Sequence, residues 1–293
     1  MDRSEIIYNP TAGEGEHTAE SVLAHFTAQG MDVILRPTDD PKWPESLDRP
    51  LDSIIIAGGD GTVHKVAEEL LERNQNHPLK VHPLGTANNI AKVLEGIQGD
   101  RQSGAGENFP FDVGEIKGLD GNRFFIESLG FGLFPSFVKA IKNEDEKERI
   151  KRDKGELLKM FLGMIDGFEP KKTRIQMEGF TIKGKFLLVE LLNINYLGPN
   201  MELSPGSAPN DGYFELCLVP IAMKEGFKAF LNRAMLGGED PADRPDPILR
   251  LPCKAITIRS KDPNFHIDDG ILDHSGQRIK VKVLKGRLNF ILS

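Results

Sequence analysis

Residues 54–65 constrain the fold of this chain more than any other stretch, because a strand-like apolar run leads straight into a glycine-rich turn. The run reads Ile54-Ile55-Ile56-Ala57-Gly58-Gly59-Asp60-Gly61-Thr62, and a helical pattern continues from Val63 to Leu71. Glycine accepts positive φ and has no Cβ, so backbone N–H groups can close on an oxyanion. The helix behind the turn adds the positive end of its dipole. The sequence therefore predicts a strand–turn–helix junction that binds phosphate.

Asp60 has two interpretations at this junction. Because it is flanked by glycines at the end of a strand, it is placed to hold a magnesium ion or to accept a proton. In a generic Gly-Gly turn, an aspartate at this position only caps the helix that follows. Further junctions of the same kind in the chain favour the first interpretation.

Two such junctions lie nearby. Val81 and His82 lead into a turn and a helical pattern that read Pro83-Leu84-Gly85-Thr86-Ala87-Asn88-Asn89-Ile90-Ala91. Upstream, an apolar run at 6–8 precedes Asn9-Pro10-Thr11-Ala12-Gly13 and an amphipathic helical pattern. In an open α/β sheet, ligands bind at the carboxyl ends of the strands. We therefore expect the three junctions to line one crevice, in which Thr86 and Asn88 or Asn89 meet a nucleotide phosphate or ribose.

Secondary-structure patterns change near residue 100. Before this point strands and helices alternate: strand 4–8, helix 15–29, strand 32–36, strand 53–57, helix 62–73, strand 80–82 and helix 86–94. This alternation predicts an α/β amino-terminal domain with a doubly wound parallel sheet. After a polar, glycine-rich linker at 99–108, strands are expected at 111–117, 122–129, 173–178, 181–183, 186–194, 213–220, 254–260, 263–268, 278–284 and 287–292. So many short strands predict a mostly β, sandwich-like second domain.

Two segments interrupt this strand pattern. Residues 143–154 mix opposite charges, which is typical of a solvated helix or loop. Apolar helical stripes follow at 157–165 and at 222–236. Such a stripe packs on a core or, alternatively, forms a wall of a lipid site or dips into a bilayer. In the second case, the basic residues of 143–154 would meet phospholipid head groups.

The composition fits a soluble two-domain protein. The chain has 293 residues, of which 39% are apolar, and a net charge of −7, which argues against a nucleic-acid binder that works through bulk electrostatics. Cys217 and Cys253 could form a disulfide, but we expect two buried free thiols in a reducing cytoplasm. No signal peptide pattern opens the chain, and no apolar run reaches the about 18–20 residues of a spanning helix. We therefore expect a cytoplasmic protein.

Three motifs resemble those of the diacylglycerol kinase catalytic family, which includes bacterial lipid kinases and the sphingosine kinases. They are NPTAG at 9–13, GGDGT at 58–62 and PLGTANNIA at 83–91, in the order and spacing of that family. The resemblance continues through FIESLGFG at 125–132 and through Asn193, Pro205 and NDGYFE at 210–215, and so covers nearly the whole chain. GGDGT alone also resembles NAD kinases, but PLGTANN is more similar to the lipid kinases.

The resemblance implies an ATP-dependent lipid kinase that transfers the γ-phosphate to a hydroxyl of diacylglycerol or a related lipid, with magnesium as cofactor. It implies Asp60 as the central catalytic residue, placed to activate the lipid hydroxyl, and Asp269 as a second carboxylate. The implied nucleotide-binding residues are Asn9, Pro10, Gly58, Gly59, Gly61, Thr62, Gly85, Thr86 and Asn88. A lipid substrate also implies peripheral contact with a membrane. A homodimer through an exposed strand edge is a further possibility.

Several residues keep an alternative interpretation. Asn9 fits a turn before Pro10 as well as a nucleotide pocket. Asp211 resembles an aspartate that binds a structural magnesium ion in some bacterial members, but an Asn-Asp-Gly hairpin turn also explains it. His64 matches a histidine of sphingosine kinase-like loops and otherwise fits a helix surface. The resemblance further implies a first domain of residues 1–110 joined by a returning last strand at about 286–293, and a lipid-binding second domain of residues 111–285.

Two positions depart from the family's pattern. Lys65 stands where the family usually has a glutamate. Ile271 follows Asp269 and Gly270 where a glutamate usually completes Asp-Gly-Glu, and an isoleucine can neither take a proton nor bind a cation. Asp268 or Asp269 could compensate for this loss. The alternatives are a catalytically silent nucleotide- or lipid-binding member of the fold and a soluble-substrate kinase of the NAD kinase kind.

Overall fold

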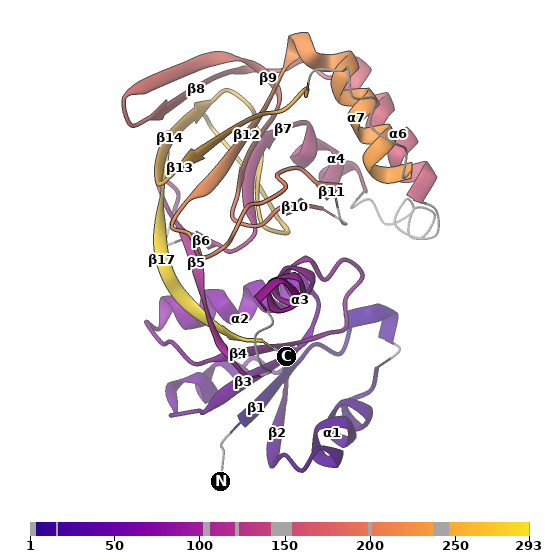
Figure 1. Ribbon diagram of the computed structural model, residues 1–293, viewed down its shortest axis with the longest axis vertical. Helices are drawn as coiled ribbons and strands as arrows, with labels where there is room; N and C mark the ends of the chain where they lie inside the picture. Colours follow the sequence, from indigo (N-terminus) through magenta and orange to yellow (C-terminus); the bar gives the residue numbers. More distant parts are fainter. Residues whose placement is uncertain are drawn as a thin grey trace.

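The computed structural model describes residues 4–15, 17–101, 106–120, 123–141, 154–198, 201–236 and 246–292. An α/β domain lies at the bottom of Figure 1 and a mostly β domain at the top, as the sequence predicted. The charged residues 143–153, residues 102–105 of the expected linker and residues 237–245 lie outside the described residues.

The amino-terminal domain is a parallel sheet with helices on both faces. Its strands are β1 (Ser4–Tyr8), β2 (Val33–Pro37), β3 (Ser53–Gly58) and β4 (Leu79–Pro83), paired in the order β2-β1-β3-β4. The helices are α1 (Ala19–Ala28) on one face and α2 (Asp60–Glu72) and α3 (Asn89–Arg101) on the other, with 3₁₀ helices at Ala12–Gly15 and Trp43–Asp48. The isoleucines of β1 and β3 are fully buried, because a parallel strand covered on both faces requires a nearly continuous apolar run.

The second domain is built from thirteen described strands, some of which continue into the first. They are β5 (Asn108–Lys117), β6 (Arg123–Phe125), β7 (Ser128–Gly132), β8 (Lys172–Met177), β9 (Phe180–Leu192), β10 (Tyr196–Leu197), β11 (Met201–Glu202), β12 (Phe214–Pro220), β13 (Leu249–Cys253), β14 (Ala255–Ser260), β15 (Asn264–Ile267), β16 (Gly270–Asp273) and β17 (Ile279–Ile291). The helices are α4 (Leu133–Ile141), α6 (Lys154–Gly167) and α7 (Lys224–Leu236), with a 3₁₀ helix at Ile221–Met223. The main sheet runs β16-β15-β7-β9-β8-β14-β17-β4-β3-β1-β2 through both domains.

Two apolar cores hold the second domain together. One lies between its strands, and the other lies under α4, α6 and α7, which pack along one side of the domain in Figure 1. Phe161 and Ile165 of α6 and Phe227 and Leu231 of α7 are buried in the second core. The core interpretation of both helical stripes is therefore confirmed for these residues.

The two cysteines and the membrane expectation have simple outcomes. Cys217 and Cys253 are free and buried, as expected, and burial raises the pKa of each thiol to about 12. In the part of the chain that the structure describes, no helix is long and apolar enough to cross a membrane.

Several element boundaries differ from the sequence prediction. The expected helix 15–29 begins at Ala19, because Thr18 and Ser21 form a capping box there. The expected strand 122–129 divides into β6 and β7, and the helix α4 after it was not predicted. β13 and β16 were also missed. The expected strands 278–284 and 287–292 form the single strand β17, which continues through Gly286 at a φ of 58°.

Strand β17 links the two domains. It pairs with β14 and β5 in the second domain, and Phe290 near its end pairs in parallel with Leu79 of β4. In Figure 1 it runs from the upper domain down to the lower sheet. Asp112 of β5 is fully buried beside this strand, where its carboxylate accepts hydrogen bonds of 2.7 Å from the backbone N–H groups of Gly212 and Gly286. Three distant segments thus meet at one carboxylate.

We expect the change Asp112→Ala to lower the free energy of unfolding by about 2–4 kcal/mol, because it leaves two buried N–H groups without their acceptor. Urea unfolding monitored by circular dichroism measures this change. The exposed Asp120→Ala is the matched control and should leave stability within about 0.5 kcal/mol of the wild type. Equal midpoints for the two variants would contradict the role given to Asp112.

Candidate active site

The three strand–turn–helix junctions meet at the carboxyl ends of β1, β3 and β4, as the sequence predicted. Together with Thr38 and Lys65, they line a cavity of about 350 Å³. Its lining residues are Asn9, Ala12, Gly13, Thr38, Gly59, Gly61, Thr62, Lys65, Gly85 and Thr86. Six of the nine predicted nucleotide-binding residues are in this set, whereas Pro10, Gly58 and Asn88 are not.

The glycine loop and the Gly85 turn approach each other backbone to backbone. A Cβ placed on Gly85 would lie 2.5 Å from Gly59 Cα, and one placed on Gly58 would lie 2.4 Å from Thr62 Oγ1. Because real Cβ atoms do not approach that closely, only glycine allows these loops to approach one another. Asn88, at a φ of 51°, accepts a hydrogen bond of 2.9 Å from Gly85 N–H and donates one of 2.7 Å to Gly85 O. Gly58 and Asn88 therefore shape the cavity from behind its lining.

Asn9 forms the expected turn and also lines the cavity. Its Oδ1 accepts a hydrogen bond from the Thr11 N–H at 3.0 Å, which makes the expected turn around Pro10. Its Nδ2 donates to Thr62 Oγ1 at 3.1 Å, which ties the first junction to the glycine loop. Asn9 thus fixes the position of a hydroxyl at the edge of the cavity.

Asp60 caps a helix, but not the helix that it begins. Its carboxylate oxygens accept hydrogen bonds from the N–H groups of Asn89 at 3.0 Å and Ile90 at 3.1 Å, at the start of α3. The N-cap of α2 is Gly59, which offers no side chain. Burial raises the pKa of Asp60, and the hydrogen bonds from α3 offset part of that rise. Asp60 therefore joins the second and third junctions while remaining next to the cavity.

A buried glutamate that the sequence reasoning missed lies beside Asp60. Glu127 is 7% exposed, and its Oε2 accepts a hydrogen bond of 3.3 Å from Asn89 Nδ2. Burial raises the pKa of Glu127 well above its ordinary value, and the nearby carboxylates of Asp60, Asp268 and Asp269 raise it further. The one available signal was an ionisable residue inside the apolar run 124–131.

Asp268 and Asp269 have different surroundings. Asp268 accepts hydrogen bonds from the N–H groups of Ile126, Glu127 and Ser128 at 2.8–3.0 Å, so it holds β7 in place. His64 Nε2 lies 3.5 Å from Asp268 Oδ2, and its side chain is only 17% exposed, so the helix-surface alternative for His64 is wrong. Asp269 faces the glycine loop, since a Cβ on Gly61 would lie 2.7 Å from Asp269 Oδ2.

Asp211 lies away from this cluster, on the surface. Its Oδ1 accepts a hydrogen bond of 2.7 Å from the Tyr213 N–H, and Gly212 has a φ of 86°, which fits the turn interpretation. Among the described residues, no three His, Cys, Asp or Glu side chains are arranged to hold a metal ion. The magnesium role of Asp211 stays a prediction.

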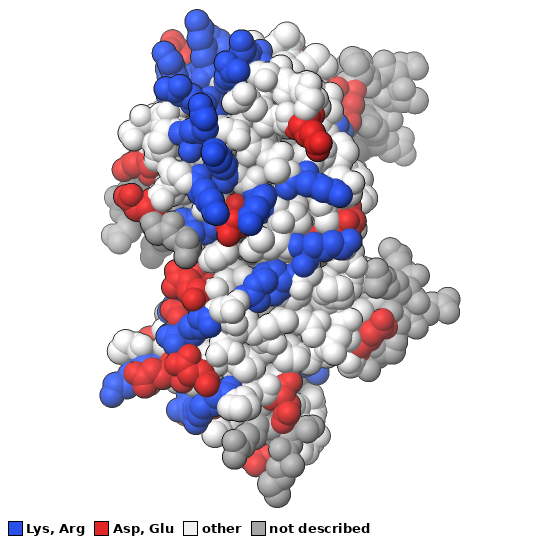
Figure 2. Space-filling view, turned by 90° about the vertical axis from the view of Figure 1, so that its left-hand side faces the viewer, with Lys and Arg blue, Asp and Glu red and all other residues white. Residues whose placement is uncertain are grey.

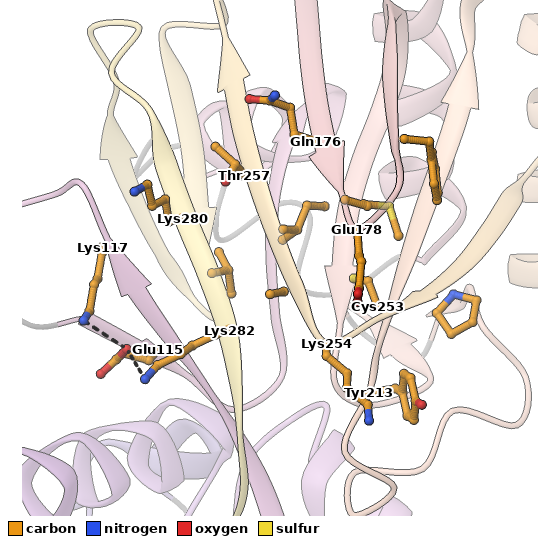
Figure 3. A pocket seen from close by; sticks show the side chains of 16 residues that line it. Glu115, Lys117, Gln176, Glu178, Tyr213, Cys253, Lys254, Thr257, Lys280 and Lys282 are labelled. Carbon is orange, nitrogen blue, oxygen red and sulfur yellow. Dashed lines mark ion pairs between the residues drawn. The ribbon is translucent and has the colours of Figure 1, made fainter.

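Larger hollows lie on the outer face of the second domain, far along the chain from the three motifs. Figure 2 shows Lys and Arg side chains gathered over this face. The hollow in Figure 3 measures about 800 Å³ and is lined by Lys117, Lys254, Lys280 and Lys282, with Glu115 paired to Lys282 at 3.1 Å. Because no residue of the three motifs lines it, we place the candidate site in the smaller cavity.

The raised pKa of Glu127 makes the folded state bind a proton that the unfolded state releases. This contribution to stability is fully present below the ordinary pKa of 4.5 and is lost as the pH rises through the folded-state pKa. We therefore expect Glu127→Gln to raise the melting temperature at pH 8 and to leave it nearly unchanged at pH 4.5. The exposed Glu107→Gln is the control, and an equal shift at both pH values would refute the buried proton.

Comparison with known proteins agrees with this site. Residues 3–111 match the model of the diacylglycerol kinase catalytic domain, and all three junction motifs fall inside the match. A diacylglycerol kinase from Bacillus subtilis is 29% identical over 252 residues, which cover 81% of this chain and 80% of that protein.

Solved structures show the same fold at lower identity. A crystal structure of a diacylglycerol kinase from Bacillus anthracis has a TM-score of 0.69 and 19% identity, and the alignment covers 100% of this chain and 97% of that one. A crystal structure of an NAD kinase from Archaeoglobus fulgidus in complex with ATP has a TM-score of 0.53 and 11% identity, over 99% of this chain and 93% of that one. The resemblance predicted from the motifs is confirmed for residues 3–111, which match the diacylglycerol kinase catalytic domain.

Proposed function

We propose that this protein is an ATP-dependent lipid kinase, which transfers the γ-phosphate to a hydroxyl of diacylglycerol or a related lipid. The observation that carries the proposal is the contact between Gly59 and Gly85, which leaves a cavity lined by backbone amides and hydroxyls. Phosphoryl transfer depends on positioning and charge stabilisation, and such a cavity supplies both. The family match of residues 3–111 supports the same function.

The nucleotide phosphates would lie in this cavity. Gly59, Gly61 and Gly85 would offer backbone N–H groups, and Thr62 and Thr86 would offer hydroxyls. Pro10, Gly58 and Asn88 would keep the three loops in shape. Magnesium is ordinarily held by one or two carboxylates plus substrate phosphates. We therefore propose that the ion enters with ATP and that no resident site is required.

Asp60 would receive the proton of the acceptor hydroxyl. The hydroxyl oxygen would attack the γ-phosphorus, and the bond between the γ-phosphorus and the bridging oxygen of ADP would break. Burial raises the pKa of Asp60, which brings a carboxylate closer to the range of an effective base at neutral pH. Asp269 is the second candidate, because it faces the glycine loop. Asp268 is unsuited to this role, since three backbone N–H groups already occupy its carboxylate.

The second domain would supply the acceptor pocket. Its residues Glu127 and Asp268 contact Asn89 of α3 and His64 of α2, so an acceptor held between the domains would lie next to Asp60. We propose residues 1–110 with the end of β17 as the nucleotide-binding domain, and residues 111–285 as the lipid-binding domain. Peripheral contact with a membrane would give access to a lipid substrate, and pairing of two chains remains a prediction.

A catalytically silent member of the family is the second candidate. Ile271 of β16 pairs with His266 of β15. It stands at the position where the family pattern has a glutamate, and its side chain offers no proton acceptor. The NAD kinase alternative has the GGDGT resemblance and the shared fold in its favour.

We expect the wild-type protein to transfer ³²P from ATP to one class of lipid in a total lipid extract separated by thin-layer chromatography. Asp60→Asn should lower the rate by about 100-fold or more, because it removes the proton acceptor. The exposed Asp120→Asn serves as the control. If ATP binds but no lipid is labelled, the silent candidate holds, and labelling by Ile271→Glu would then identify the missing group. Labelling of NAD instead of lipid would contradict both candidates.

We expect Gly85→Ala to weaken ATP binding by about tenfold or more, because the new methyl group would push the Gly59 loop away. Isothermal titration calorimetry measures the dissociation constant. Gly96→Ala is the matched control, since a Cβ there meets nothing within 4 Å. Equal ATP affinity for the two variants would place the phosphates elsewhere.

A further inference from the structure

Lys65 departs from the family's pattern, yet the structure places it in the wall of the candidate cavity. It lies on α2 three residues after Thr62 and four after Gly61, and all three line the cavity. Residues three and four apart share one face of a helix. The opposite face of α2 is buried, with Val63, Val66, Ala67 and Leu70 in the core. The direction of Lys65 is therefore fixed by the burial of its own helix.

The ammonium group of Lys65 is held at the rim of the cavity. Its Nζ donates a hydrogen bond of 2.9 Å to Thr38 O, and Thr38 also lines the cavity. The same Nζ lies 5.6 Å from the ring centroid of Trp43, which is 2% exposed. Within the described residues, no ion pair joins Lys65 to a carboxylate. Both contacts are therefore with groups that carry no net charge, and the positive charge of Lys65 stays uncompensated.

The surroundings of the cavity need such a charge. Lys65 is the only charged residue among those described as lining it. The carboxyl groups of Asp60, Glu127, Asp268 and Asp269 form an acidic cluster next to the glycine loop. A triphosphate that entered the cavity would meet backbone amides on one side and these carboxylates on the other. Backbone dipoles supply partial charges only, whereas an ammonium group supplies a full positive charge.

We propose that Lys65 is a phosphate-binding residue of this site and contacts the terminal phosphate of the nucleotide. The proposal rests on the proposed function, because it assigns a contact to the nucleotide of that reaction. Because Lys65 is the one charged side chain among the described lining residues, it gives this wall of the cavity a positive charge. It therefore favours nucleotides with more phosphates over those with fewer.

The variant Lys65→Met tests this assignment, because methionine keeps the length and the apolar stem but removes the charge. We expect the dissociation constant of ATP, measured by calorimetry, to rise by about 10- to 100-fold, as for the loss of one charge-assisted hydrogen bond. The affinity for ADP should fall less, and the affinity for adenosine should stay unchanged. Lys65→Arg should retain most of the ATP affinity. Added salt should weaken ATP binding to the wild type more than to Lys65→Met.

The exposed Lys42→Met is the matched control for the change in net charge, because Lys42 lies on the same domain and does not line the cavity. Thermal unfolding of all variants checks that they fold. If Lys65→Met binds ATP as tightly as the wild type, or loses ATP and adenosine to the same extent, the assignment is wrong while the proposed function stands. If the wild type itself binds no ATP, both are wrong.

Discussion

The site depends on a backbone-to-backbone contact that only two glycines permit. Gly59 and Gly85 follow the ends of the neighbouring parallel strands β3 and β4, and a Cβ on Gly85 would lie 2.5 Å from Gly59 Cα. Asp60 reinforces this contact. It is the first residue of α2, and its carboxylate accepts hydrogen bonds from the first N–H groups of α3. Two helix N-termini are thereby held side by side, and their dipoles both favour an anion between them. The cavity, its lining and the proposed chemistry all follow from this arrangement.

Two acidic residues of the second domain, Glu127 and Asp268, contact the helices of the first domain. Asp268 binds three successive N–H groups of the 126–128 segment, and this places Glu127 against Asn89 of α3. Burial raises the pKa of Glu127 well above its ordinary value, and the neighbouring carboxylates of Asp60, Asp268 and Asp269 raise it further. The two domains thus meet where the carboxyl group of Glu127 contacts Asn89 at the start of α3. Strand β17, which pairs with β4, and the hydrogen bonds to Asp112 hold the two domains together at this contact.

Much of the first domain could be predicted from the sequence, because its strands are apolar runs and its turns carry glycine, asparagine and threonine. The crevice itself followed from the rule for open α/β sheets, and the structure brings Asn9, Gly59, Thr62, Gly85 and Thr86 together as expected. The target of Asp60 could not be predicted. Helix capping is a local rule, but Asp60 caps a helix that begins 29 residues later.

Other features depend on distant contacts in the same way. Glu127 is inconspicuous in the sequence, because its pKa is set by residues from three other segments. The continuity of β17 through Gly286 depends on Asp112, which lies 174 residues earlier. In the sequence, Lys65 stands out only because it differs from the glutamate of the family pattern. Its position on α2 places it in the cavity wall. Sequence patterns identify such residues, and tertiary packing decides what they face.

A crystal structure with a non-hydrolysable ATP analogue tests the central claim most directly. The account predicts the triphosphate between the Gly59 and Gly85 loops, with Thr62 and Thr86 in contact and Asp60 beside the γ-phosphate. A triphosphate bound instead to the lysines of the outer face in Figure 3, with this cavity empty, would contradict it.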